Sequence, residues 1–211
     1  MSELEREPDA AASVFGDRIE VARAFTTALA AHGEERGLIG PLELPRLWTR
    51  HILNSAVTAP LFTGTVGDVG SGAGLPGLVL AIARPDLHLV LIEPMERRVA
   101  WLSEQTDALG LSNVEIVRAR AEDWARGRVL DVVTARAVSA LKTLIPLTAP
   151  LVRSGGELIL LKGASVAGEI EAAKKQIRAF GLSDVRVEFA GEDLVAEPTR
   201  VLRATVRRLR L

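Results

Sequence analysis

Val66-Gly-Asp-Val-Gly-Ser-Gly-Ala-Gly-Leu-Pro-Gly77 is the stretch that decides the fold of this 211-residue chain. Valines flank the Gly-Asp pair, three glycines follow at alternate positions, and Pro76 stands where a helix can begin. Glycine tolerates a positive φ and has no β-carbon to keep a ligand away from the main chain. Proline is accepted in the first turn of a helix, where unpaired N–H groups point outward. The pattern therefore predicts a strand, a tight turn and a helix start that form a ligand cradle.

Two nucleotide-binding fingerprints overlap in this cradle. Residues 72–77 fit the dinucleotide pattern G-x-G-x-x-G, and residues 68–74 fit the acidic-x-G-x-G-x-G pattern of enzymes that use S-adenosylmethionine (SAM). The apolar run 87–92 then ends at Glu93, an acid that can accept hydrogen bonds from both hydroxyls of a ribose. These features favour an adenosine-type cofactor over a glycine turn with a solvated glutamate, and they leave its identity open.

Composition limits the remaining possibilities. The formal net charge of −1 gives no global attraction to nucleic acid, so any such contact must be a local patch. The absence of cysteine excludes disulfides and thiolate sites, and three histidines argue against zinc, so we expect no metal. The N-terminal residues are charged and no apolar stretch is long enough to span a membrane. We expect a cytoplasmic protein, and a monomer because no apolar seam demands a dimer.

The first 60 residues predict a helical N-terminal extension (1–60) ahead of a core (61–211). One amphipathic helix is expected over residues 8–31 and a second over residues 45–59. At helical spacing, the apolar residues of the second helix share one arc, while Arg50, His51 and Asn54 fall on the opposite side. These three side chains either contact a substrate or form an ordinary solvated face.

From residue 65 onward, strand patterns alternate with helical ones, which predicts a parallel, doubly wound α/β sheet. Helices are expected over residues 95–109, 139–152 and 166–180. Beyond the cradle, strands are expected over residues 87–93, 114–117, 129–134, 157–161, 185–189 and 200–209.

Ligands of open α/β sheets bind beyond the carboxyl ends of the strands, where several polar residues should converge. They are the cradle glycines Gly70, Gly72 and Gly74, with Glu93, Arg120, Ala121, Glu122, Arg136 and Lys162. Glu122 either meets an adenine amino group or is a helix N-terminal acid. Arg136 and Lys162, at the ends of central strands, need an anionic or electron-rich partner. A structural ion pair with Glu93 or Glu122 is the alternative.

Missing residues narrow the reaction. Without tyrosine the Tyr-Lys relay of short-chain dehydrogenases is impossible, and without cysteine thiolate addition to a pyrimidine is excluded. The chain also lacks the Asn/Asp-Pro-Pro-Tyr/Phe signature of amino methylation after its fourth strand. An acceptor that is already nucleophilic remains, such as guanine N7. Its methylation needs alignment rather than a general base, and Arg136 or Lys162 could hold O6 or a phosphate.

Six motifs, taken in order along nearly the whole chain, resemble the family of 16S ribosomal RNA guanine-N7 methyltransferases, also called glucose-inhibited division protein B. They are R-H-I-L-N-S (50–55), the cradle (68–77), R-R (97–98), R-A-R-A-E (118–122), T-A-R-A (134–137) and L-K-G (161–163). The resemblance implies a class I SAM-dependent methyltransferase (Rossmann-like) fold, a seven-stranded mostly parallel sheet with helices on both faces. It further implies that SAM methylates N7 of one guanine in the decoding-region (530) loop of 16S rRNA in the small ribosomal subunit.

The resemblance implies that Gly70, Leu75, Ala121, Glu122 and Arg136 bind the cofactor and that Arg50, His51, Arg97, Arg120 and Lys162 contact the RNA or the target base. With the residues indicated by the cradle and the strand ends, the predicted cofactor-binding set is Asp68, Gly70, Gly72, Gly74, Leu75, Glu93, Ala121, Glu122 and Arg136. The predicted catalytic set is Arg136, Lys162 and Arg120, and with the C-terminal arginines the predicted RNA-binding set is Arg50, His51, Asn54, Arg97, Arg200 and Arg203. Asn54 departs from the family pattern, which usually has Asp there, so a charge role for it is in doubt.

Arginines gather near the C-terminus, at positions 200, 203, 207, 208 and 210. They either bind phosphates or protect an edge strand from aggregation. Two other classes of function remain open: a small-molecule SAM- or NAD-dependent enzyme, and a noncatalytic ribosome-assembly factor.

Overall fold

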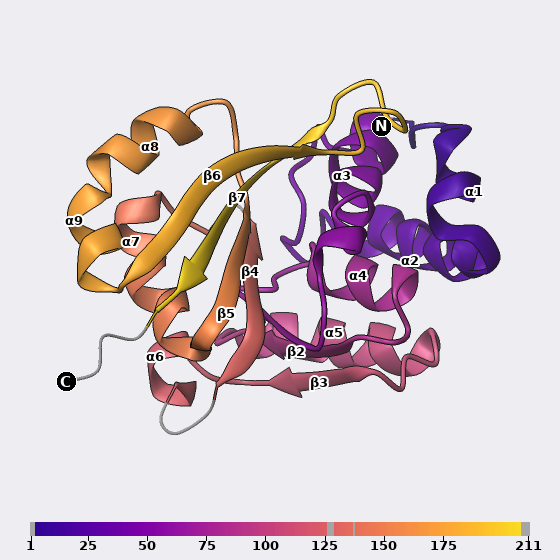
Figure 1. The fold of residues 1–211 in the computed structure, drawn as a ribbon. Coiled ribbons are helices and arrows are strands. Elements are labelled where there is room, and N and C mark those ends of the chain that lie inside the picture. Colours follow the sequence, from indigo (N-terminus) through magenta and orange to yellow (C-terminus); the bar gives the residue numbers. More distant parts are fainter. Residues whose placement is uncertain (1–2, 126–128, 137, 208–211) are drawn as a thin grey trace.

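The computed structural model describes residues 3–125, 129–136 and 138–207. A seven-stranded sheet in the order β3-β2-β1-β4-β5-β7-β6 forms its centre (Figure 1). β7 runs antiparallel to both of its neighbours, β5 and β6, and the pairs formed by β1 to β5 with one another are parallel. This topology confirms the predicted α/β, mostly parallel sheet. The strands are β1 Thr65–Val69, β2 His88–Ile92, β3 Val114–Val117, β4 Leu130–Arg136, β5 Val152–Leu161, β6 Leu182–Ala190 and β7 Thr199–Val206.

Helices cover both faces of the sheet, and Figure 1 shows the two helical layers on either side of it. One layer contains α1 Ala10–Phe15, η1 Gly16–Arg18, α2 Ile19–His32, η2 Leu44–Arg46, η3 Trp48–Leu53, α3 Asn54–Ala56, η4 Ala59–Leu61, α4 Gly77–Ala83 and α5 Glu96–Ala108. The other contains α6 Ala121–Trp124, α7 Leu141–Thr148, η5 Ala149–Leu151, α8 Val166–Ala172 and α9 Lys174–Ala179. Each layer has its own hydrophobic core against the sheet.

The N-terminal helices belong to the first of these cores. Phe25, Leu29 and Trp48 are buried in the same cluster as Ile82 of α4 and Trp101 of α5. The first 60 residues therefore pack directly on the sheet layer, and the boundary between extension and core at residue 60 stays a prediction.

Four expected helices are wrong in detail. The helix expected over residues 8–31 is interrupted at Gly16, where φ is 51°. The helix expected over residues 139–152 begins only at Leu141 and gives way to η5 at Ala149, because the proline at position 150 has no N–H to continue the helical hydrogen bonds, and β5 already begins at Val152. The helix expected over residues 166–180 breaks at Ala173.

The fourth correction concerns residues 45–59. Their central part, η3, is a π-helix rather than an α-helix. A π-turn adds a residue to the turn and shifts the phase of every side chain that follows. In the C-terminal region, β7 ends at Val206, three residues before the end of the last expected strand, whose residues 208–209 lie outside the described residues.

Candidate active site at the carboxyl edge of the sheet

The glycine-rich loop after β1 forms the predicted cradle. Gly70, Gly72 and Gly74 all have positive φ, at 73°, 55° and 93°. Beneath them, Asp68 Oδ2 accepts a hydrogen bond of 3.0 Å from the N–H of Gly77, the first residue of α4. A β-carbon on Gly77 would lie 2.6 Å from that oxygen, so the helix start can approach the strand only because this residue is glycine.

Asp68 supports the cradle from below. Its side chain is fully buried, burial raises its pKa to about 7, and its Oδ1 has no hydrogen-bond partner among the described residues. Asp68 does not line the cavity above the loop. A direct contact between Asp68 and the cofactor therefore stays a prediction. What the structure shows is that Asp68 holds the end of the loop in place by accepting the hydrogen bond from Gly77.

Glu93 stands just beyond the end of β2, beside the cradle. Its Oε2 accepts from the Gly72 N–H at 3.0 Å and its Oε1 from the Met95 N–H at 2.9 Å. Only 1% of the residue is exposed. Each carboxylate oxygen has a second lone pair, so Glu93 can still accept from the two hydroxyls of a ribose.

A cavity of about 540 Å³ lies over this loop, a size that suits a small-molecule ligand. We call it the cofactor cavity. The loop residues 70–73, Leu75 and Glu93 line one side, and residues 38–40, Glu43 and His51 line another. A β-carbon on Gly72 would meet nothing nearer than an oxygen at 3.6 Å, so the main chain there faces open space. These residues fit a nucleoside cofactor.

The three residues 120–122 do not line the cofactor cavity. They lie at the start of α6, after β3, which pairs with β2. Ala121 is buried, while Arg120 and Glu122 are exposed. Their predicted contacts with the adenine and the substrate stay predictions.

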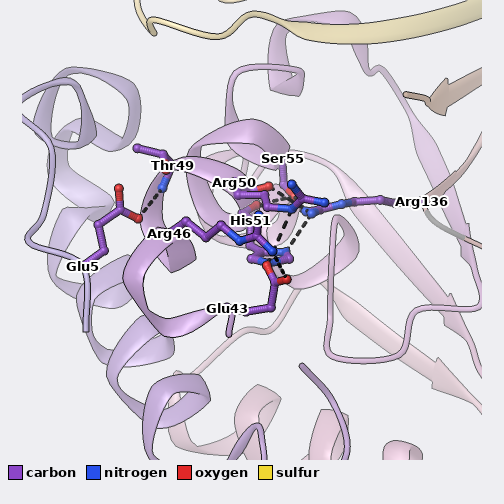
Figure 2. Close-up of polar contacts among 8 residues, drawn as sticks. All are labelled: Glu5, Glu43, Arg46, Thr49, Arg50, His51, Ser55 and Arg136. Atoms are coloured by element: carbon purple, nitrogen blue, oxygen red, sulfur yellow. Dashed lines mark hydrogen bonds and ion pairs between the residues drawn. The ribbon is translucent and has the colours of Figure 1, made fainter. Parts of the chain in front are cut away.

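Arg136, the last residue of β4, points into the η3–α3 segment (Figure 2). Its Nη1 donates to the His51 carbonyl oxygen at 3.2 Å and to Ser55 Oγ at 3.1 Å. Its Nη2 donates to the Arg50 carbonyl oxygen at 3.0 Å and to His51 Nδ1 at 2.7 Å. The guanidinium thus ties the central strand to the π-helix.

The alternative interpretation of Arg136, an ion pair with Glu93 or Glu122, is wrong. The hydrogen bonds of its guanidinium go to carbonyl oxygens, a hydroxyl and an imidazole. Burial, and then the nearby Arg50, lower its pKa to about 10, which still leaves it charged at neutral pH.

His51 is held between a cation and an anion. Because a guanidinium can only donate, Nδ1 must accept from Arg136, which leaves the proton on Nε2. Nε2 then donates to Glu43 Oε2 at 2.5 Å. Burial, and then Arg136, lower the pKa of His51, which favours this neutral form. Glu43 also accepts from Arg46 at 2.6 Å, so the chain of contacts reaches the surface.

The expected polar face divides, because His51 contacts Arg136 and Arg50 does not do so through its side chain. The Arg50 side chain is 58% exposed, whereas that of His51 is 12% exposed and turned towards Arg136. Periodicity at 3.6 residues per turn placed both on one solvated face. Periodicity did not indicate that Glu43 and Ser55 are their partners, because those contacts depend on how η3, α3 and β4 fold together.

A second cavity, of about 860 Å³, lies on the other side of Arg136. We call it the substrate cavity. Its lining includes the cations Arg46, Arg50, Arg136 and Lys162 against one carboxylate, that of Glu197. Lys162 is largely buried, and its Nζ contacts Glu169 Oε2 at 2.7 Å and the Ser139 carbonyl oxygen at 3.1 Å. Since Arg136 lines both cavities, the two meet at this residue.

The family model for rRNA small subunit methyltransferase G matches residues 18–197. The chain belongs to this family. Ribosomal RNA small subunit methyltransferase G of Leifsonia xyli subsp. xyli is 65% identical over 205 residues, which cover 97% of this chain and 98% of that protein. The enzyme of the same name from Clavibacter michiganensis subsp. michiganensis is 62% identical over 204 residues, covering 96% and 97%.

Similarity to solved structures is lower and concerns the fold. A SAM-dependent O-methyltransferase from Thermotoga maritima is 17% identical, with a TM-score of 0.55 over 75% of this chain and 66% of that one. The predicted class I fold, the family resemblance and the prediction of a SAM-dependent methyltransferase enzyme are confirmed.

In this member of the methyltransferase G family, the predicted RNA-binding residues differ in their exposure and in the contacts that they already make within the protein. Asn54 lines the substrate cavity, and its carbonyl oxygen accepts from Thr199 Oγ1 at 2.7 Å. Arg97 is exposed but lines neither cavity. Arg200 lies over the ring of Phe189, with its guanidinium carbon 5.0 Å from the centroid.

Arg203 is already occupied. Its Nη2 contacts both carboxylate oxygens of Glu157, at 2.9 and 2.7 Å, and its Nη1 contacts Glu188 at 3.3 Å. A phosphate would have to compete with both carboxylates. The alternative, protection of an edge strand, is wrong at this position, because β7 lies between β5 and β6 inside the sheet. Arg208 and Arg210 lie outside the described residues.

Over the described ranges 3–125, 129–136 and 138–207, no group of three or more His, Asp or Glu side chains is arranged to hold a metal ion. The same part of the chain has no helix with the length and apolar character that a membrane span requires.

Proposed function

We propose that this methyltransferase transfers the methyl group of SAM to N7 of a guanine in the decoding-region loop of small-subunit rRNA. Membership of the family supports the cofactor and the rRNA substrate. The observation that carries the proposal is the meeting of the cofactor and substrate cavities at Arg136. A donor and an acceptor bound on either side of one residue can be aligned for direct transfer.

The cofactor cavity contains the groups that a nucleoside ligand requires. Glu93 accepts from the ribose hydroxyls, and the glycines of residues 70–74 let the ligand approach the main chain. Leu75 adds an apolar wall. Residues 121–122 lie outside the cavity lining, at the start of α6, and we propose that the adenine extends towards them. When bound, SAM supplies an electrophilic methyl group.

The substrate cavity provides positive charge for a nucleotide. Arg50 and Lys162 are placed to bind a phosphate or guanine O6. Guanine N7 has a free lone pair and no proton to remove, so the site needs no general base. The hydrogen bonds of Arg136 are already directed to η3 and α3, so its guanidinium does not block N7. We assign to Arg136 the role of fixing the distance between the two cavities.

A guanine in a duplex is a poor substrate for such a site. The major groove of A-form RNA is too deep and narrow for side chains to reach N7, so the target must be unpaired or turned out of the helix. A loop of the small subunit meets this requirement. We also propose that the protein acts in the cytoplasm as a monomer and without a metal ion.

The experiment that tests the proposal is transfer of a labelled methyl group from SAM to small subunits purified from cells that lack this protein. We expect the label in small-subunit rRNA as 7-methylguanosine, identified by mass. Label at another position of the base would contradict the N7 assignment. Protein that binds SAM but labels neither subunits nor stripped rRNA would favour a small-molecule methyltransferase, and protein that binds subunits without SAM would favour an assembly factor.

A further inference from the structure

A row of three side chains crosses the carboxyl edge of the sheet on neighbouring strands. The N–H of Lys162, just after β5, donates to the Arg200 carbonyl oxygen at 2.9 Å. Arg200 of β7 is in turn the ladder partner of Phe189 on β6. Residues directly opposite each other in a ladder project from the same face of the sheet. The row therefore runs from Lys162, in the substrate cavity, outward to the edge strand.

Phe189 is an unusual residue for this surface. Of the five Phe and three Trp in the sequence, all within the described residues, it is the only one classed as exposed, at 47%. A single exposed apolar side chain means little by itself. Phe189 is informative because the guanidinium of Arg200 lies over its ring.

The charge of Arg200 is not neutralised by a carboxylate in the part of the chain that the structure describes. Every ion pair of β7 there goes to Arg203, whose guanidinium meets Glu157 and Glu188. Arg200 and Arg203 lie three positions apart along β7, so their side chains project from opposite faces of the sheet. One face of β7 thus carries a neutralised cation, and the other carries a cation stacked on an aromatic ring beside the substrate cavity.

We propose that Phe189 and Arg200 form a stacking platform for an unpaired nucleotide that flanks the target guanine. The inference rests on the proposed function and extends it to the neighbouring RNA. Bases of single-stranded RNA stack on aromatic rings and on guanidinium planes, and the arginine donors bind phosphate. Two strand spacings separate Phe189 from Lys162, about 10 Å, so a nucleotide close to the target in the same strand can reach the ring.

The first test compares variants of Phe189 in methyl transfer to small subunits that lack the modification. Phe189→Leu keeps an apolar side chain but removes the ring, and Phe189→Trp keeps a ring. We expect the leucine variant to raise KM for the subunit roughly ten-fold, with kcat at saturation unchanged, and the tryptophan variant to match wild type. Leu194→Ala, which alters another exposed apolar residue, is the matched control and should leave KM unchanged.

The second test separates the ring from the charge. Arg200→Ala should reduce the slope of log(kcat/KM) against log salt by about 0.7, the value for one lost contact with a single-stranded phosphate, whereas Phe189→Leu should leave the slope unchanged. Arg200→Lys should restore the slope. Thermal unfolding midpoints close to that of wild type will show that the variants fold normally.

The outcomes also distinguish this inference from the proposed function. Wild-type protein that transfers no methyl group to subunits contradicts the proposed function, and the platform is then tested by fluorescence anisotropy with a labelled single-stranded RNA oligonucleotide. Equal KM or equal oligonucleotide affinity for wild type and Phe189→Leu would overturn the platform. A loss of affinity in Leu194→Ala as large as that in Phe189→Leu would also overturn it, because general apolar contact would then explain both.

Discussion

The position of Arg136, which lines both cavities, depends on its contact with one residue, His51. In its neutral form, Nδ1 accepts from Arg136 and Nε2 donates to Glu43. A proton on Nδ1 would point at the Arg136 guanidinium and break that contact. The pKa of His51 is lowered in the folded protein from its ordinary value of about 6.5, first by burial. As pH falls below about 6.5, the unfolded chain takes up this proton more readily than the folded one.

The stability that His51 contributes is therefore complete above pH 6.5 and is lost as pH falls through its lowered folded pKa. We expect the free energy of unfolding in urea of wild type minus that of His51→Asn to decrease from pH 7.5 to 5.5. His88→Gln controls for the loss of a histidine at an exposed position. Asp68 contributes a slope of the opposite sign, since its pKa is raised to about 7, but it is common to all three proteins. Parallel curves for wild type and His51→Asn would contradict this account.

Gly72 provides a second test at the residue scale. A side chain there would project into the cofactor cavity, and an aspartate would place a second carboxylate beside Glu93. Gly72→Asp should therefore abolish SAM binding in calorimetry, by more than a hundred-fold in affinity. Gly110 is a matched control, because its φ of 62° is similarly strained for aspartate and its β-carbon position is also open. Gly110→Asp should lose stability and keep SAM binding, and an equal loss of binding in both variants would remove the cofactor assignment.

At the scale of the elements, the strands could be predicted from sequence and η3 could not. The parallel strands contain short apolar runs, so their pattern is local, and the strand expected over residues 87–93 matches β2, His88–Ile92, to within one residue at each end. A π-turn has no comparable local pattern. In this protein it is held by distant groups: Glu5 accepts from the Thr49 N–H at 3.0 Å, and Arg136 donates to two of its carbonyl oxygens (Figure 2).

This dependence predicts that Arg136 is needed for both folding and activity. Lysine keeps the charge at this position but cannot reproduce the planar fork of donors. Arg136→Lys should lower the free energy of unfolding by about 1–3 kcal/mol, because buried carbonyl oxygens lose their donors, and should reduce methyl transfer at least ten-fold. Urea denaturation and initial rates measure the two effects.

Arg50→Ala is the control for that prediction. The Arg50 side chain is exposed, while its main-chain oxygen still receives Arg136. We expect stability within about 0.5 kcal/mol of wild type, as for most surface substitutions, and a higher KM for the subunit. Normal stability in Arg136→Lys would show that the π-helix holds its shape without the fork.

At the scale of the whole molecule, the cradle and the convergence of Arg136 and Lys162 on one edge followed from sequence, because parallel strands place their carboxyl ends together. The division into two cavities did not. It requires Glu43, His51 and residues 38–40 to fold over the sheet, and those contacts join segments that are distant in sequence. The ion pairs of Arg203 with two carboxylates also join segments that are distant in sequence. The pattern of charges therefore could not show that Arg203 is paired whereas Arg200 lies over an aromatic ring.

The contacts between the N-terminal helices and the rest of the protein predict that residues 61–211 alone do not form a fixed tertiary structure. Removing residues 3–60 would expose the buried faces of Leu80 and Ile82 on α4 and of Trp101 on α5, which now pack against the N-terminal helices. It would also remove one wall of the cofactor cavity. A chain of residues 61–211 should therefore bind a hydrophobic dye, lose its near-ultraviolet circular dichroism and fail to bind SAM, as expected when secondary structure forms without fixed packing. Full-length protein under the same conditions is the control. Cooperative unfolding of the shortened chain, with SAM affinity equal to that of the full chain, would instead establish residues 61–211 as an independent domain.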